Sequence, residues 1–265
     1  MSIQRLDPGL RPPIQGPDDT SILAYSTYFD DFYEGGFVKD LALTDESDPS
    51  GGKFSNIAEG AAWNCSFPGG TSSASTDEVI RIADDGQFGV LELVTDADAD
   101  DIWSMQLNGE GFKLDAGRTI VFETRIAIAD ADDFDLFIGL GIADDIPITA
   151  ISDYVGFGMV DGDATPQAVT GKNSTGEAIV AGNGTSLSDL GAANDLSDGT
   201  ASTNFVVLKF VATAAEVKFY VDGTLTATHA GNIPDDEYMT PTISMRNGAD
   251  SNTLFVDYIY CSQNR

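Results

Sequence analysis

The chain has 265 residues, and its 43 Asp and Glu against 13 Lys and Arg give a formal net charge of −30. This sign makes nucleic acid and anionic membranes poor partners, because binding to phosphates depends on Lys and Arg. The apolar fraction of 42% is enough for a core, while the absence of a run of about 18 apolar residues predicts no membrane-spanning helix.

The first 26 residues differ in composition from the rest of the chain. Four prolines, at positions 8, 12, 13 and 17, lie among residues whose charges sum to −1. Proline fixes φ and lacks an N–H, so residues 1–26 are expected to form an extended arm before one domain at 27–265. The start has no apolar h-region, so no secretory signal peptide is expected.

From residue 27 onward, apolar and polar residues alternate in short runs rich in Val, Ile, Phe and Tyr. Such alternation predicts half-buried strands. Asp222-Gly223 between two runs predicts a hairpin, and no amphipathic helix of three turns is found. The predicted strands are 61–67, 79–82, 88–94, 102–107, 119–128, 134–142, 154–160, 205–211, 216–221, 224–228 and 253–260.

Residues 161–203 give a weaker signal, because Gly, Ala, Ser, Thr and Asn dominate them. Ragged strands are expected there, with a long loop at 182–203 that is either an ordinary surface loop or a contact with a partner. Cys65 and Cys261 form no CxxC motif or metal cluster, and are interpreted as two small buried residues. A disulfide between them is the alternative if their strands are neighbours.

The C-terminal third carries a family resemblance. Its segments are 216–223, 226–229, Asn232-Ile233-Pro234 and 254–259, and the middle segments 122–126, 139–141 and 154–157 fit the same pattern. Together they resemble the concanavalin A-like (laminin-G-type) jelly roll of phage structural proteins, over roughly residues 60–265. The resemblance implies an all-β, two-sheet antiparallel jelly-roll sandwich, here with an extended N-terminal arm.

A search for catalytic residues finds none. Hydrolases of this fold that resemble laminarinases keep two glutamates around an aspartate on one strand, but residues 132–137 contain no Glu and Glu123 is alone on its strand. His229 is the one histidine, and a lone histidine is more often a surface or cap residue than a general base. No Gly-x-Ser-x-Gly elbow accompanies it. The pairs Gly139/Gly141 and Gly156/Gly158 lie inside strand patterns, which favours close packing or a bulge over phosphate binding. The chain is therefore expected not to be an enzyme.

Acidic turns raise the question of calcium. Asp96, Asp98 and Asp100 have the spacing of a calcium loop, but its sixth position is Asp101 and its twelfth is Leu107. Further acidic turns occur at 130–133 and 161–163. Solvated turns explain them most simply in so acidic a chain. The question of a bound calcium ion stays open, with no ligand assigned. No other cofactor is expected.

The resemblance and the charge together predict a phage virion structural protein, made in the host cytoplasm. Its expected role is that of a capsid decoration (cement) protein, whose −30 body faces solvent on the outer capsid surface, away from packaged DNA. The major capsid protein and copies of the chain itself, for instance in a trimer, are the expected partners. The residues expected to contact neighbouring subunits lie in the arm: Arg5, Leu6, Leu10, Arg11, Ile14 and Ile22.

The alternative function is that of a carbohydrate-binding module on a tail fibre or virion surface. Sandwiches of this fold bind sugars through exposed aromatic side chains and loop carboxylates. Trp63 and Trp103 are the candidates, although each lies in an alternating strand, which is typical of core positions. A cellular adhesion domain is a third reading, but it would require a signal peptide.

Overall fold

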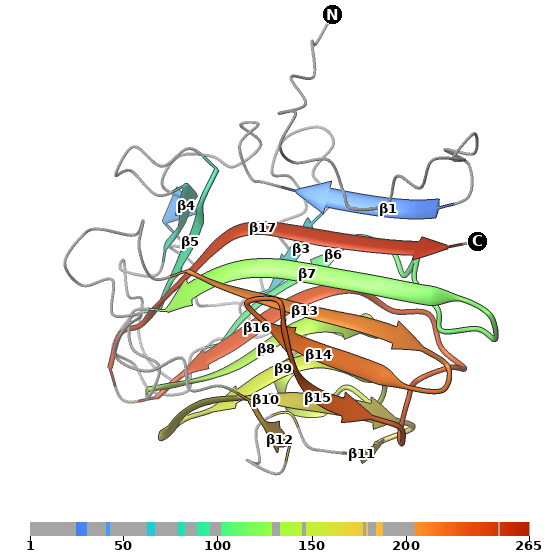
Figure 1. The fold of residues 1–265 in the computed structure, drawn as a ribbon. Helices are drawn as coiled ribbons and strands as arrows, with labels where there is room; N and C mark the ends of the chain where they lie inside the picture. The colour runs from blue at the N-terminus through green and yellow to red at the C-terminus, as the bar shows by residue number, and fades with distance from the viewer. Residues whose placement is uncertain are drawn as a thin grey trace, which may run out of the picture.

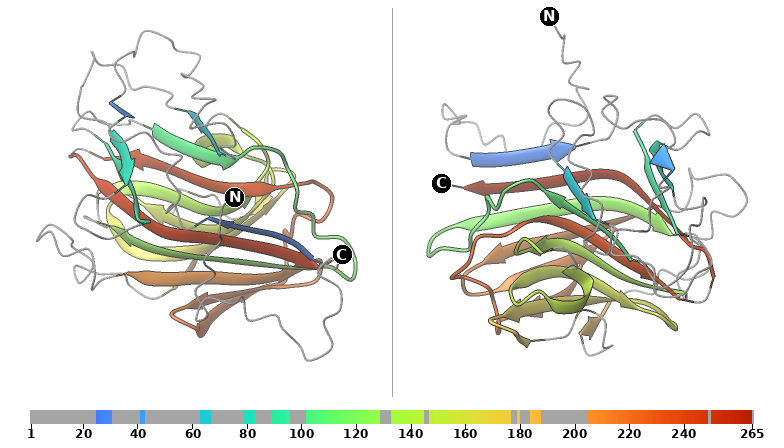
Figure 2. Two further views of the ribbon diagram at one scale, coloured as in Figure 1. Left: turned by 90° about the horizontal axis from the view of Figure 1, so that it is seen from above. Right: turned by 180° about the vertical axis from the view of Figure 1, so that it is seen from behind.

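The structure is a computed structural model, and it describes residues 25–30, 41–42, 63–66, 79–82, 89–95, 102–128, 133–144, 147–176, 179, 184–187, 205–248 and 250–264. Within these ranges every regular element but one is a β-strand, and the strands form two antiparallel sheets packed face to face (Figures 1 and 2). In the described ranges, no helix is long and apolar enough to cross a membrane. The predicted all-β sandwich is confirmed.

The nine-stranded sheet runs in the order β15-β14-β13-β7-β17-β5-β4-β2, with β1 also pairing with β17. The first half of β17 pairs with β5, and its second half pairs with β1. The first and last described strands therefore lie side by side (Figure 1). The bounds are β1 (Tyr25–Asp30), β2 (Leu41–Ala42), β4 (Val79–Ile82), β5 (Leu91–Val94), β7 (Thr119–Ile128), β13 (Val206–Thr213), β14 (Val217–Val221), β15 (Thr224–His229) and β17 (Thr253–Asn264).

The eight-stranded sheet runs in the order β11-β10-β9-β8-β16-β6-β3, and β12 pairs with β10. A short helix, α1 (Pro147–Ala150), contacts β8 and β16. The bounds are β3 (Trp63–Ser66), β6 (Ile102–Leu107), β8 (Phe134–Gly141), β9 (Tyr154–Val160), β10 (Asp163–Lys172), β11 (Thr175–Gly176), β12 (Thr185–Ser186) and β16 (Thr240–Asn247).

The main core lies between the sheets and follows from the alternation of the strands. In β7 the residues alternate between half-buried and buried as far as Ile126, which is the signature of a strand with one face on the core. Stacked rings of Phe122 and Phe210, with centroids 5.1 Å apart, lie in this core beside Phe157 and Phe219. Aromatic pairs of this kind add to the stability gained from burial.

The strands found closely match those predicted from the alternation, and the hairpin at Asp222-Gly223 is confirmed. Val221 pairs with Thr224, and the two loop residues have φ values of 48° and 77°. A two-residue loop with two positive φ values is a type I′ turn, whose twist matches that of the flanking strands. The turn therefore fixes the register between β14 and β15.

Several strands differ from the sequence-based expectation. β1, β2 and β16 are not predicted, and β10 is a ten-residue strand where ragged strands were expected. In β16, Pro241 weakens the strand signal, because proline cannot donate to a ladder. It is tolerated because only β8 pairs with β16 at that position, and pairing with β6 begins at Thr242. Within residues 182–203, where a long loop was expected, the structure describes one short strand, β12.

Candidate functional site

The outer face of the eight-stranded sheet, which points away from the main core, holds a second apolar cluster. β8 is buried along its whole length, so side chains on both of its faces are covered. Phe137 projects outward and meets the ring of Tyr154 edge to face, with centroids 5.9 Å apart. The buried members of this cluster are Phe137, Ile148, Ile151, Tyr154, Val169 and Ile179. Side chains of the chain itself therefore occupy the centre of this face.

Glycines make this close covering feasible. A Cβ on Gly139 would lie 2.3 Å from the carbonyl oxygen of Val155, and a Cβ on Gly158 would lie 2.6 Å from that of Ile179. Both distances are too short for any side chain, so these positions require glycine for a close backbone approach. The expectation that these glycines serve packing is confirmed.

Polar side chains on the same face bond to one another. The hydroxyls of Ser104 and Ser244 are 2.7 Å apart. Gln106 donates to the carbonyl of Ile142 at 2.9 Å and to the Thr242 hydroxyl at 3.0 Å, and its carbonyl accepts the Asp144 N–H at 2.8 Å. These buried bonds join β6 to β16 and to the segment that follows β8, so they serve the structure.

The four central strands of this face, β6, β8, β9 and β16, contain a single carboxylate, Asp135 on β8. Asp135 is buried. It accepts a hydrogen bond from Arg246 Nε at 2.8 Å and another from the Asp161 N–H at 2.9 Å. A retaining glycosidase needs two carboxyl groups about 5 Å apart. These four strands supply one carboxyl group, that of Asp135, and it is paired with Arg246.

Glu123 lies on β7 in the opposite sheet. It forms an ion pair of 3.2 Å with Lys209 and accepts a 2.9 Å hydrogen bond from the Tyr258 hydroxyl. Burial of the Tyr258 phenol, reinforced by the adjacent Glu123 carboxylate, raises the pKa of Tyr258 above that of an ordinary tyrosine. Tyr258 therefore stays protonated at neutral pH and keeps this bond.

His229 ties the two sheets together. It is buried on β15, its Nδ1 lies 3.1 Å from the Thr170 hydroxyl on β10, and its Nε2 lies 2.9 Å from the Thr185 hydroxyl on β12. Its ring meets that of Phe219 edge to face at 5.1 Å. The expectation of a surface or cap residue is wrong, because both ring nitrogens find hydroxyl partners between the sheets.

Two of the acidic turns meet near Gly248. A Cβ on Gly248 would lie 2.5 Å from Asp133 Oδ1 and 3.1 Å from Asp161 Oδ1. The other oxygen of Asp133 accepts the Asp250 N–H at 2.9 Å. Among the residues that the structure describes, no group of three His, Cys, Asp or Glu is arranged to hold a metal ion. The segment 96–101 lies outside the described residues, and the calcium ion stays a prediction.

Trp63 and Trp103 are core residues, with exposed fractions of 3% and 1%. They are therefore closed to a sugar. Among the residues whose side chains are described, the exposed aromatic ones are instead Phe29 on β1 and Tyr238 before β16, at 46% and 48%. Sequence alternation could not single out Tyr238, because it lies in a connection after Pro234 and outside any periodic pattern. Cys261 is a free, fully buried thiol, and burial raises its pKa well above the ordinary value.

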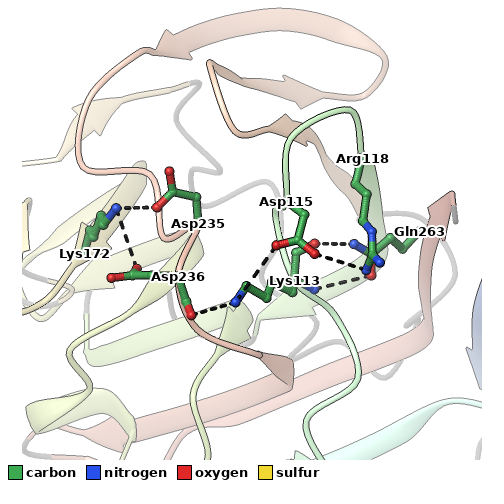
Figure 3. A network of polar contacts seen from close by, with 7 residues as sticks. All are labelled: Lys113, Asp115, Arg118, Lys172, Asp235, Asp236 and Gln263. Carbon is green, nitrogen blue, oxygen red and sulfur yellow. Dashed lines mark hydrogen bonds and ion pairs between the residues drawn. The ribbon is translucent and has the colours of Figure 1, made fainter.

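Tyr238 lies next to Lys113, which belongs to a network of polar contacts. Figure 3 shows this network with Lys113, Asp115, Arg118, Lys172, Asp235, Asp236 and Gln263. The ammonium of Lys113 lies 5.2 Å from the centre of the Tyr238 ring and donates to the backbone carbonyl of Asp236 at 2.9 Å. Lys113 also lies 3.9 Å from Asp115, which forms a 3.5 Å ion pair with Arg118. The backbone of Lys113 exchanges hydrogen bonds with the side chain of Gln263 on β17.

The second half of the network joins the β15–β16 connection to the β10–β11 turn (Figure 3). Lys172 bonds to Asp235 and lies 3.7 Å from Asp236, whose carboxylate accepts a 2.9 Å hydrogen bond from the side chain of Asn173. The bond to Asp235 raises the pKa of Lys172, and the bond from Asn173 lowers the pKa of Asp236. The network therefore keeps opposite charges paired around a partly exposed aromatic ring.

The arm residues expected to bind partners, Arg5, Leu6, Leu10, Arg11, Ile14 and Ile22, lie outside the described residues. The first described residue is Tyr25, which pairs with Asn264 where β1 meets β17. Trp63 and Trp103, the other binding candidates named from the sequence, are buried in the core. The contacts of the arm stay a prediction.

Comparisons with known proteins establish the fold. No family model and no curated protein matches the chain. An endo-1,3-beta-glucanase from Streptomyces sioyaensis is similar in structure, with a TM-score of 0.51 and 15% identity, covering 91% of this chain and 97% of that one. A Bacillus licheniformis beta-glucanase has a TM-score of 0.51 and 14% identity, covering 88% and 96%. The chain therefore has the concanavalin A-like jelly-roll fold.

Proposed function

We propose that the chain is a non-catalytic structural protein of a phage virion, acting as a decoration protein on the outer capsid surface. The observation that carries this proposal is the covered face of the eight-stranded sheet. Its centre is packed with apolar side chains, its polar groups bond to one another, and Asp135 is held by Arg246. The four central strands of this face supply one carboxylate, Asp135, where a retaining glycosidase uses two, which supports a non-catalytic role.

The sequence supports the virion part of the proposal. The segments 216–223 and 254–259 resemble jelly rolls of phage structural proteins, and the net charge of −30 suits a body that faces solvent and avoids packaged DNA. β1 follows directly on the Pro-rich segment and is joined to β17 by six residue pairs. Mechanical force on the arm would therefore be transmitted through β1 to β17 inside the nine-stranded sheet.

The test uses purified particles of the phage that encodes the chain. Mass spectrometry should find the chain in amounts comparable to the major capsid protein, and particles stripped of it should rebind the full-length protein. A truncation that starts at Tyr25 keeps β1 and should lose rebinding while its circular dichroism stays unchanged. Absence of the chain from particles, or undiminished rebinding of the folded truncation, would overturn the proposal.

A second candidate function is glycan binding at the charged end of the sandwich. The observation that favours it is the exposed ring of Tyr238 with the Lys113 ammonium over it, where Lys113 also bonds to the backbone of Asp236 and Asn173 bonds to the Asp236 carboxylate. Sugars stack their apolar faces on aromatic rings and bond their hydroxyls to carboxylates and amides. The sandwich fold is compatible with this use.

A glycan array followed by calorimetry tests this candidate. Saturable binding should disappear in Tyr238→Ala and persist in Leu225→Ala, which removes a side chain of similar exposure (50% against 48%) from a hairpin strand. An array on which no glycan binds, or binding that persists in Tyr238→Ala, would contradict glycan recognition at this end of the sandwich.

A further inference from the structure

The charge of the chain is distributed unevenly between strands and connections. The seventeen described strands hold six acidic residues (Asp30, Glu92, Glu123, Asp135, Asp163, Asp257) and six basic residues (Arg81, Arg125, Lys172, Lys209, Lys218, Arg246). This leaves 37 of the 43 acidic and 7 of the 13 basic residues elsewhere, so the strands are neutral and the other segments carry the whole −30. Like charges directly opposite each other on a sheet are destabilising, which disfavours such a charge on the strands.

A row of paired residues crosses the outer face of the nine-stranded sheet. Registers place Phe29 opposite Tyr260, Tyr260 opposite Glu123, Glu123 opposite Lys209, Lys209 opposite Tyr220, and Tyr220 opposite Leu225. The row spans β1, β17, β7, β13, β14 and β15, which lie in this order in the sheet (Figure 1). We call it the cross-strand band: Phe29, Tyr260, Glu123, Lys209, Tyr220 and Leu225.

The band has exposed apolar side chains at its two ends and an ion pair at its centre, while Tyr260, between Phe29 and Glu123, is buried. Phe29 and Leu225 are 46% and 50% exposed, and they are two of the three exposed large hydrophobic side chains among the described residues. Glu123 and Lys209 form a 3.2 Å ion pair between them. Exposed apolar side chains around a neutral centre are typical of surfaces that bind protein rather than nucleic acid or sugar.

Half-buried apolar side chains widen the band into a patch. Val121 pairs with Val211 in the next row, and both are half-buried on the outer face. On the other side of the band, Arg125 forms a 2.5 Å ion pair with Asp257 and lies 4.2 Å from the centre of the Phe205 ring. Each acid named on this patch therefore has a basic partner on it.

We propose that this outer face, centred on the cross-strand band, binds the same face of a second copy of the chain in a two-fold dimer. Two copies that each carry −30 repel each other, and neutral faces are where they can meet at least cost. Under a two-fold axis, Glu123 and Lys209 of one copy can face Lys209 and Glu123 of the other. The inference deepens the proposed function, because it names the surface through which copies on a virion would associate.

The dimensions of the face suit a stable dimer. Six strands spaced about 4.8 Å apart extend about 24 Å, and the ten residues of β7 extend about 34 Å, giving roughly 800 Å² on each copy. This is the area that each partner contributes to a standard protein interface. The other sheet is a weaker candidate, because its own residues already cover its outer face.

The experiment is sedimentation velocity of the isolated full-length chain between about 1 and 200 µM, in 0.1 M and 1 M NaCl. We expect a monomer–dimer equilibrium that salt strengthens, because screening reduces repulsion between the acidic connections. The double variant Phe29→Asp/Leu225→Asp should weaken dimerisation at least tenfold. Tyr238→Asp, which adds one negative charge at an exposed aromatic residue on the sandwich end, should leave it unchanged.

A footprinting measurement on the unmodified chain guards against misfolding of the double variant. Hydroxyl-radical oxidation of Phe29 and Tyr220 should fall as concentration rises, while that of Tyr238 stays constant. A monomer at every concentration, a trimer, or a dimer equally sensitive to Tyr238→Asp would overturn the inference. None of these results bears on whether the chain is found in virions, so the two proposals fail separately.

Discussion

At the scale of single residues, His229 shows how a polar side chain can join two layers of a sandwich. Its two ring nitrogens meet Thr170 and Thr185 of the eight-stranded sheet, although the histidine itself lies on β15 of the other sheet. One nitrogen of a neutral ring donates and the other accepts, and a threonine hydroxyl can do either. Its position on the strand is visible in the sequence, but its partners, 59 and 44 residues away, are not.

We predict that His229→Ala lowers the free energy of unfolding by about 2–4 kcal/mol. The change leaves two hydroxyls without their partner and removes a ring that packs on Phe219. Urea denaturation followed by tryptophan fluorescence measures the change. Thr228→Ala, an exposed neighbour on the same strand, is the control and should stay within about 0.5 kcal/mol. Equal stability of the two variants would contradict the role given to His229.

At the scale of elements, β8 and β9 show why glycines recur inside two strands. Gly139 and Gly156 are paired between them, and a Cβ on either would strike backbone atoms of the neighbouring strand. Backbone atoms cannot rotate out of the way as a flexible side chain can, so the crowding must be relieved by moving a whole strand. These positions therefore control how closely the outer apolar cluster lies on the sheet.

Gly139→Ala is expected to destabilise the protein by about 3 kcal/mol or more. Gly111→Ala provides the matched control, because a Cβ there has no atom within 4 Å and its change should stay within about 0.5 kcal/mol. Thermal unfolding of both variants by differential scanning calorimetry compares them. A tolerated alanine at position 139 would show that β8 and β9 can separate at little cost.

Alternation was sufficient to predict most strands, including β8, but it missed β16, whose burial does not alternate. β8 and most of β16 are buried on both faces, so the sequence alone could not show which of their faces meets the main core. The tryptophans were interpreted as core residues on the same pattern, and this is confirmed. Tyr238 was missed as an exposed candidate, since exposure in a connection depends on how distant segments pack around it.

At the scale of the whole molecule, the separation of neutral strands from acidic connections governs the response to salt. The described side chains of Lys and Arg are all in ion pairs: Lys113, Arg118, Arg125, Lys172, Lys209, Lys218 and Arg246. The excess acids therefore repel one another across the folded surface. Partly exposed ion pairs contribute about 0–1 kcal/mol each, so screening them costs little.

We accordingly predict that the melting temperature rises by several degrees between 0.05 M and 1 M NaCl, because screening relieves the repulsion among unpaired carboxylates. Differential scanning calorimetry at a protein concentration low enough to keep the chain monomeric measures the effect. An equal osmolality of sucrose is the control for general solvent exclusion. A melting temperature that falls with salt would mean that the paired charges outweigh the unpaired ones.

The layered all-β architecture follows from the amino-acid sequence alone, since period-two alternation is a local property of each strand. The negative charge of the surface and the tight turn at Asp222-Gly223 follow in the same way, because they depend on composition and on one dipeptide. The remaining features arise only from the tertiary structure. It covered the outer face of one sheet, placed His229 between the layers, and aligned six separate strands so that Phe29 and Leu225 end one neutral band. Those features depend on which distant strands become neighbours, and pairing of that kind is set by the packing of the whole chain.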